Sequence, residues 1–157
     1  MTKTVVAWYA LALLVLGLDQ LSKGWIVAHF EYGQPWEITR FFNLTLLHNT
    51  GAAFSFLSDA GGWQRWFFTT VAAVVSVVLV IWLARVKDTN RMESLALALV
   101  LGGALGNLYD RVALGYVVDF IVIHYEHHYW PAFNIADSAI VAGAGLLLIG
   151  GFKAPAK

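Results

Sequence analysis

The chain has 157 residues, of which 59% are hydrophobic and only 13% are charged. A soluble domain carries about a quarter charged residues, so this composition excludes an ordinary soluble protein and indicates an integral membrane protein. The formal net charge of zero argues against nucleic acid as a partner. The chain has no cysteine, which excludes disulfides, thiolate nucleophiles and cysteine-ligated zinc, so any catalysis must use carboxylate, histidine, hydroxyl or lysine groups.

Four apolar stretches are long enough to predict membrane spans, since a transmembrane helix needs roughly 20 mainly apolar residues. The predicted spans cover residues 5–27, 66–84, 94–110 and 134–152 of a single membrane domain, 1–157. The first stretch could instead be a cleaved signal peptide, but Asp-Gln-Leu-Ser-Lys stands where small residues would mark a cleavage site. In the third span, Gly102 and Gly106 form a small-xxx-small pattern that predicts close helix packing.

Four spans place both termini on one side of the membrane. Six lysine and arginine residues fall on that side and three on the other: Lys3, Arg85, Lys87, Arg91, Lys153 and Lys157 against Arg40, Arg65 and Arg111. The positive-inside rule therefore predicts cytoplasmic termini, with segments 28–65 and 111–133 outside the cytoplasm.

The two outer segments carry different patterns. Residues 36–47 are rich in aromatic and β-branched types, which predicts two short strands around Thr39-Arg40. A turn at residues 49–51 and an apolar run at 52–57 follow, and the run predicts a short surface helix. The apolar run 112–123 is too short to span, so we expect it to form an interfacial or re-entrant element. The predicted fold is therefore all-α, with four transmembrane helices, a small extracytoplasmic sheet and one surface helix.

Two aspartates, Asp119 and Asp137, lie within strongly apolar sequence, in GYVVDFI and FNIADSAI. Burying a carboxylate near a bilayer costs several kcal/mol, so such groups usually have a function. Asp119 is predicted to lie near the membrane edge and Asp137 near the outer end of the last span, so the two can meet at one depth. Close carboxylates share a proton and can act as acid and base, as in an aspartyl protease. The alternative is two unrelated interfacial carboxylates that are hydrogen-bonded for structure.

Other polar residues accompany this pair. Asp19 and Lys23 are four residues apart on one helix face and predict an ion pair. Polar groups at the outer end of the third span and in the flanking segments predict either a structural network or an active-site shell: Asn49, Asn107, Asp110, Arg111 and Asn134. The histidines at 124, 127 and 128 lack the spacing of a metal site, so no metal is expected.

Five motifs occur in the order seen in the lipoprotein signal peptidase (signal peptidase II) family, which the chain resembles over almost its whole length. They are LDQLSK (18–23), HNTGAAFS (48–55), GNLYDR (106–111), GYVVDFI (115–121) and FNIADS (133–138). The resemblance implies a four-span aspartic endopeptidase of the bacterial inner membrane. Such an enzyme cleaves signal peptides from diacylglyceryl-modified prolipoproteins, on the amino side of the lipidated cysteine, near the surface of the outer leaflet.

Carried over residue by residue, the resemblance implies that Asp119 and Asp137 are the catalytic pair. It implies a polar shell around the substrate made of Asn49, Gly51, Asn107, Arg111 and Asn134. It also implies that Asp19, Lys23 and Asp110 support this shell. The implied partners are the prolipoprotein substrate and membrane lipids, without nucleic acid or cofactor, and the enzyme is expected to be monomeric.

Three other classes fit parts of the sequence. A presenilin-like protease would share the Tyr109-Asp110 element, but no GxGD motif occurs around Asp137. A proton-coupled transporter would place its acids at the bilayer midplane and commonly shows repeated halves, and no repeat is visible. A purely structural membrane subunit would have no need for the cluster of Asn, Asp and Arg residues at the outer ends of the spans.

Overall fold

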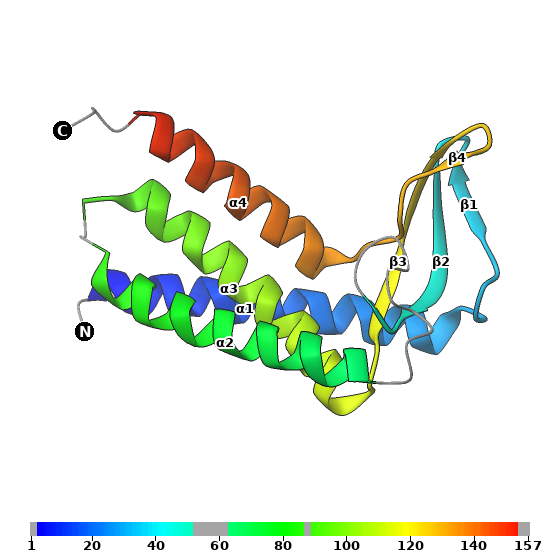
Figure 1. The fold of residues 1–157 in the computed structure, drawn as a ribbon. Coiled ribbons are helices and arrows are strands. Elements are labelled where there is room, and N and C mark those ends of the chain that lie inside the picture. Colours follow the sequence, from blue (N-terminus) through cyan, green and yellow to red (C-terminus); the bar gives the residue numbers. More distant parts are fainter. Residues whose placement is uncertain (1–2, 52–62, 87–88, 154–157) are drawn as a thin grey trace.

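The computed structural model describes residues 3–51, 63–86 and 89–153. The described residues form four helices, and a small sheet stands at one end of them, as Figure 1 shows. The start of the first helix and the end of the last lie at the end away from the sheet (Figure 1). In chain order the elements are α1 (Lys3–His29), β1 (Trp36–Thr39), β2 (Phe42–Asn49), α2 (Trp63–Arg85), α3 (Arg91–Ala113), β3 (Val117–Tyr125), β4 (His128–Tyr129) and α4 (Ile135–Lys153).

Within the described part of the chain, α1, α2 and α3 are long and apolar enough to cross a membrane. The apolar part of α4 is shorter and runs over Ile135–Gly151. Along α2, Val74, Val77 and Val78 are more than half exposed. A run of exposed aliphatic side chains on one helix is unfavourable in water but suits contact with lipid. All four predicted apolar stretches thus form helices. Helices α1, α2 and α3 extend one to three residues beyond each predicted limit, and α4 begins and ends one residue later than predicted.

Glycines bring α3 close to its neighbours. A Cβ atom on Gly102 would lie 2.6 Å from the carbonyl oxygen of Ala12 in α1. On Gly103 it would collide with the carbonyl of Ala136 in α4, and on Gly106 it would lie 2.5 Å from a carboxylate oxygen of Asp19. The prediction that Gly102 and Gly106 allow close helix packing is confirmed. This approach lets polar side chains of α1, α3 and α4 meet.

The sheet is antiparallel, with strand order β1-β2-β3-β4. The two strands predicted within 36–47 are confirmed as β1 and β2. Residues 112–123, expected to form an interfacial or re-entrant element, divide between the end of α3 at Ala113 and strand β3, which begins at Val117. Pairing with β2 satisfies the backbone of this apolar run, which is too short to span. The short helix predicted at 52–57 lies outside the described residues.

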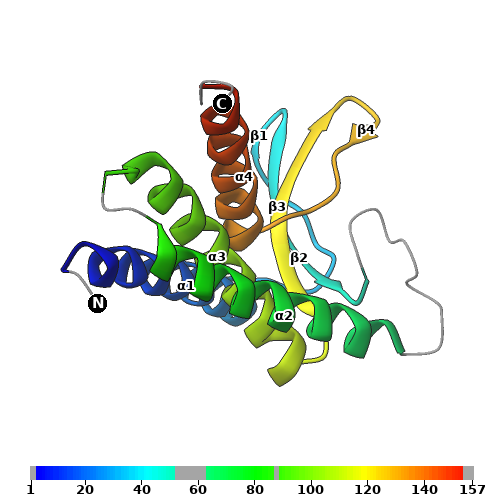
Figure 2. The ribbon, with the colours of Figure 1, turned by 60° about the vertical axis from the view of Figure 1, so that its left-hand side comes forward.

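A small apolar cluster seats the sheet on the end of α1. Ile26 of α1 packs with Leu46 of β2 and with Val118 and Phe120 of β3, and all four side chains are buried. Figure 2 shows β3 beside β2 in the sheet, running past the start of α4. Successive strand residues point to opposite faces. With Val118 and Phe120 facing the cluster, Asp119 points the other way.

Candidate active site

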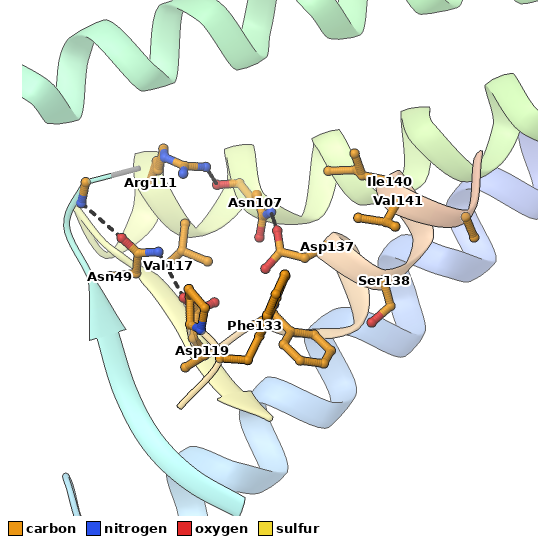
Figure 3. A pocket seen from close by; sticks show the side chains of 15 residues that line it. Asn49, Asn107, Arg111, Val117, Asp119, Phe133, Asp137, Ser138, Ile140 and Val141 are labelled. Atoms are coloured by element: carbon orange, nitrogen blue, oxygen red, sulfur yellow. Dashed lines mark hydrogen bonds between the residues drawn. The ribbon is translucent and has the colours of Figure 1, made fainter. Parts of the chain in front are cut away.

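Asp119 and Asp137 line one cavity, although they come from different elements. Asp119 lies in β3 and Asp137 in the first turn of α4. The cavity has a volume of about 670 Å³, and Figure 3 shows both carboxylates with the side chains around it. Its polar lining consists of Asn49, Asn107, Arg111, Asp119, Asp137 and Ser138, and its larger apolar residues are Val117, Trp130, Pro131, Phe133, Ile140 and Val141.

Asn134, which is fully buried, bonds to both carboxylates. Its side-chain amide donates to Asp119 Oδ1 at 2.8 Å, and its backbone N–H donates to Asp137 Oδ2 at 3.2 Å. In return the backbone N–H of Asp137 donates to Asn134 Oδ1 at 2.9 Å. This reciprocal pair is a capping box at the N-terminus of α4, in which Asn134 is the N-cap and Asp137 the third helical residue. The same asparagine therefore starts the helix and joins the two acids.

Asn49 holds the second oxygen of Asp119. Its side-chain amide donates to Asp119 Oδ2 at 2.9 Å, while its own Oδ1 accepts from the backbone N–H of Gly51 at 3.1 Å. The contact with Gly51 fixes which end of the amide faces the carboxylate. Asn49 ends β2, whose pairing with β3 brings it beside Asp119.

Two residues from the last turns of α3 complete the polar wall. Asn107 donates from its side chain to Asp137 Oδ1 at 2.7 Å. Arg111, one turn later, donates to the carbonyl of Asn107 at 3.2 Å. Its guanidinium lies close enough to Asp119 and Asp137 for the charges to interact. One cation thus faces two carboxylates across the cavity.

Behind the cavity lies a buried charged group, which we call the bracket and define as Asp19, Lys23 and Asp110. Lys23 Nζ lies 2.7 Å from Asp19 Oδ2 and 2.9 Å from Asp110 Oδ2. It also donates to Asn107 Oδ1 at 3.1 Å. None of the three bracket residues is more than 3% exposed. The predicted pairing of Asp19 with Lys23 is confirmed, and Asp110 joins it from α3.

Each carboxylate of the bracket also binds the backbone next to one of the cavity aspartates. Asp19 Oδ1 accepts from the N–H of Ala136 at 2.9 Å, one residue before Asp137. Asp110 Oδ2 accepts from the N–H of Val118 at 3.1 Å, one residue before Asp119. Because Lys23 ties the two carboxylates together, the bracket sets how the β3 and α4 backbones stand relative to each other.

The structure brings all ten residues singled out from the sequence into one connected network. Sequence reasoning missed Gln20, which donates to Asp110 Oδ1 at 2.9 Å and to Asp19 Oδ2 at 3.1 Å. Its place beside Asp19, in a helix of apolar residues, was an available signal. The apolar wall made by Trp130, Phe133, Ile140 and Val141 was also missed, because such residues do not stand out in a membrane protein.

Asp119 is only 3% exposed, and this burial raises the pKa of its carboxyl from 3.8 to about 7. The nearby charge of Asp137 also raises it, while hydrogen bonds from Asn49 and Asn134 oppose the rise. Asp137 is more accessible than Asp119 and lies at a helix N-terminus, where the helix dipole favours a negative charge. The two acids therefore have different environments, as expected of a pair that divides acid and base roles.

The apolar helices and the fold place the chain in a class, the multi-pass membrane enzymes. Two solved structures described as bacterial membrane enzymes share the fold. One, at 2.3 Å resolution, has a TM-score of 0.84 and 31% identity and covers 96% of this chain and 93% of its own. The other, at 1.9 Å, has a TM-score of 0.81 and 33% identity over 94% and 93% of the two chains.

Sequence relatives narrow this class. Residues 11–153 match the family described as Signal peptidase (SPase) II. A lipoprotein signal peptidase of Cellvibrio japonicus is 57% identical over 150 residues, or 96% of this chain and 88% of the relative. One of Teredinibacter turnerae is 63% identical over 141 residues, or 90% and 84% of the two chains. The chain belongs to the signal peptidase II family.

Proposed function

We propose that this chain is an aspartic endopeptidase that removes signal peptides from diacylglyceryl-modified prolipoproteins, with Asp119 and Asp137 as its catalytic pair. The observation that carries the proposal is the double contact of Asn134, which bonds both carboxylates at the edge of one cavity. Family membership and relatives that carry the name lipoprotein signal peptidase support the choice of reaction. The double contact of Asn134 supports a catalytic pair over two independent carboxylates that serve only the structure.

The environments of the two acids support different starting states. Asp119, whose pKa is raised to about 7 by burial, holds the shared proton at rest and acts as the acid. Asp137 acts as the base, since it lies at a helix N-terminus, where the helix dipole favours a negative charge, and accepts hydrogen bonds on both oxygens. Asn49, Asn107 and Asn134 hold the carboxylates in place.

Hydrolysis then follows in two proton-balanced steps. Asp137 takes a proton from water, the water oxygen attacks the carbonyl carbon of the scissile bond, and Asp119 gives its proton to the carbonyl oxygen. In the second step, Asp137 gives its proton to the leaving nitrogen as the C–N bond breaks. Asp119 takes a proton back from a hydroxyl of the intermediate. The products are a free amine and a carboxylic acid, and both aspartates return to their starting states.

The cavity suits a substrate that is part peptide and part lipid. Its polar wall contains the catalytic pair and Arg111, and its apolar wall runs from Trp130 and Phe133 to Ile140 and Val141 of α4. We propose that the peptide crosses the polar wall while the acyl chains of the diacylglyceryl group lie along the apolar wall. Lipid attachment would then keep the scissile bond, on the amino side of the modified cysteine, at the depth of the pair.

We further propose that α4 is a fourth span and that the chain is a single multi-pass domain of the inner membrane. Its 19 residues give α4 a length of about 28 Å at roughly 1.5 Å a residue, close to the thickness of a hydrocarbon core. Four spans and the distribution of basic residues support cytoplasmic termini, with the sheet and cavity near the surface of the outer leaflet. All the proposed catalytic groups come from one chain, so the proposed site does not require a second copy.

The test is cleavage of a purified diacylglyceryl-modified prolipoprotein in detergent or lipid. We expect Asp119→Asn and Asp137→Asn each to abolish cleavage, because each removes a carboxyl group that must exchange protons. Glu37→Gln is the matched control, since Glu37 is an exposed carboxylate of β1, outside the cavity lining. Normal cleavage by either aspartate variant would refute the catalytic pair. Equal cleavage of the unmodified precursor would refute recognition of the lipid.

A further inference from the structure

Helix α2 contributes no residue to the lining of the cavity within the described part of the chain. Its first turn nevertheless reaches the end of α3. Arg65 donates from Nε to the carbonyl of Arg111 at 3.1 Å and from Nη2 to the carbonyl of Val112 at 3.0 Å. One guanidinium thus binds two consecutive carbonyls in the last turn of the helix that carries Arg111.

These carbonyls are among the last four of α3, which have no N–H partner within the helix. At this end, the N–H groups of Leu114 and Gly115 both donate to the carbonyl of Asp110. The next two carbonyls along α3 are the ones that Arg65 binds. A cation is also favourable at the negative end of a helix dipole, and the planar guanidinium suits two acceptors better than an ammonium does.

The chain beyond α3 is shaped around this guanidinium. Gly115 has a φ of +89°, a conformation that side chains rarely adopt. A Cβ atom there would lie 3.1 Å from Nη1 of Arg65, tighter than an ordinary contact. Gly115 therefore both allows the turn and leaves room for the side chain of Arg65.

The same face of α2 also supports the side chain of Arg111. Phe68 lies three residues after Arg65, so the two share a helix face. The guanidinium carbon of Arg111 lies 5.9 Å from the centre of the Phe68 ring, within cation–π range. Arg65 binds the backbone carbonyl of Arg111, and the ring of Phe68 packs against the guanidinium of Arg111. Helix α2 therefore constrains both ends of Arg111, which faces the two carboxylates.

We propose that Arg65 is a positioning residue for the peptidase reaction, and that it acts by fixing Arg111 relative to Asp119 and Asp137. This inference rests on the proposed function. It assigns to α2 a role in catalysis through the last turn of α3. A displacement of about 1 Å at a reacting centre can cost up to about 100-fold in rate, so loss of a remote clamp can be visible in turnover.

The test compares kcat and KM of the purified full-length chain with those of four variants: Arg65→Ala, Arg65→Lys, Arg111→Ala and the Arg65→Ala/Arg111→Ala double variant. We expect Arg65→Ala to lower kcat roughly tenfold with little change in KM, since the clamp orients reacting groups without touching substrate. Lysine carries its donors on one nitrogen and cannot match the separate Nε and Nη2 donors of Arg65, so the kcat of Arg65→Lys should fall between those of wild type and Arg65→Ala. Arg85→Ala is the matched control, because it removes the same side chain from the exposed far end of α2.

The double variant separates positioning from a general effect on folding. If Arg65 acts through Arg111, Arg65→Ala should change kcat little once Arg111 is already alanine. An equal fold-loss in both backgrounds, or wild-type kcat in Arg65→Ala, would overturn the proposal. If Arg65→Ala does not fold, Arg65→Lys decides: a reduced kcat at an unchanged unfolding temperature supports the clamp, and wild-type kcat refutes it. Failure of the wild-type chain to cleave would count against the proposed function instead.

Discussion

Replacing Lys23 with methionine tests whether the bracket holds the site together. Methionine keeps much of the side-chain length and removes the ammonium that lies 2.7 Å from Asp19 and 2.9 Å from Asp110. Removing one partner of a buried ion pair costs about 3–5 kcal/mol, since the remaining charge is left without compensation. Here two carboxylates and the amide oxygen of Asn107 lose their shared donor, so we expect the upper part of that range.

A loss of this size should lower the unfolding temperature by on the order of 10 °C. The assay is thermal unfolding of the purified chain in detergent, followed by tryptophan fluorescence, since the chain has seven tryptophans and no cysteine for a thiol dye. Cleavage should fall as well, because both carboxylates bind backbone next to the catalytic pair. Adding Asp19→Asn to Lys23→Met should restore part of the stability, since an asparagine oxygen still accepts from Ala136 without a charge.

Arg91→Met removes a positive charge from an exposed position at the start of α3 and serves as the control. If Lys23→Met unfolds within a degree or two of wild type and cleaves at the normal rate, the bracket does not do what its geometry indicates. If the double variant is less stable than Lys23→Met alone, uncompensated charge is not the cause of the loss.

Four further results are expected. Because burial raises the pKa of Asp119 to about 7, kcat/KM should fall as pH rises through about 7, and a pH–rate profile flat to pH 9 would contradict this. The folded state holds the Asp119 proton more tightly than the unfolded state does, so wild type is most stable at acid pH and loses stability as pH rises from 3.8 to about 7. Asp119→Asn should therefore unfold at a higher temperature than wild type at pH 8 but not at pH 4. Asn134→Ala should lower the free energy of unfolding by about 2 kcal/mol, through loss of a helix cap and a buried hydrogen bond, and should reduce kcat. A normal kcat would show that the contacts of Asn134 with the two carboxylates are dispensable. Gly106→Ala should lower both stability and activity, since its Cβ would lie 2.5 Å from Asp19 Oδ2, whereas Gly17→Ala in open space should have little effect on activity.

The sequence predicted most of the helical fold because long apolar runs leave few alternatives in a membrane protein. It did not predict β3, because a short apolar run reads the same whether it lies at the interface or pairs with another strand. The pairing depends on β2, which lies some 70 residues earlier in the chain.

The polar residues and the order of the motifs predicted which residues form the candidate site, but they did not predict the hydrogen bonds that connect those residues. Nothing in the letters shows that Asn134 bonds both acids, or that Asp19 and Asp110 reach the backbone at Ala136 and Val118. These contacts join residues up to 117 positions apart and depend on how closely the helices approach. Gln20 and Arg65 were not assigned to the site for the same reason.

The capping box at the start of α4 makes helix fraying and loss of the catalytic arrangement a single event. The N–H of Ala136 is bound by Asp19, and that of Asp137 by Asn134. Neither amide can open to solvent without releasing a residue that holds the pair. Hydrogen–deuterium exchange at these two amides therefore measures the free energy of local opening, which sets the fraction of molecules whose active site is assembled at any moment.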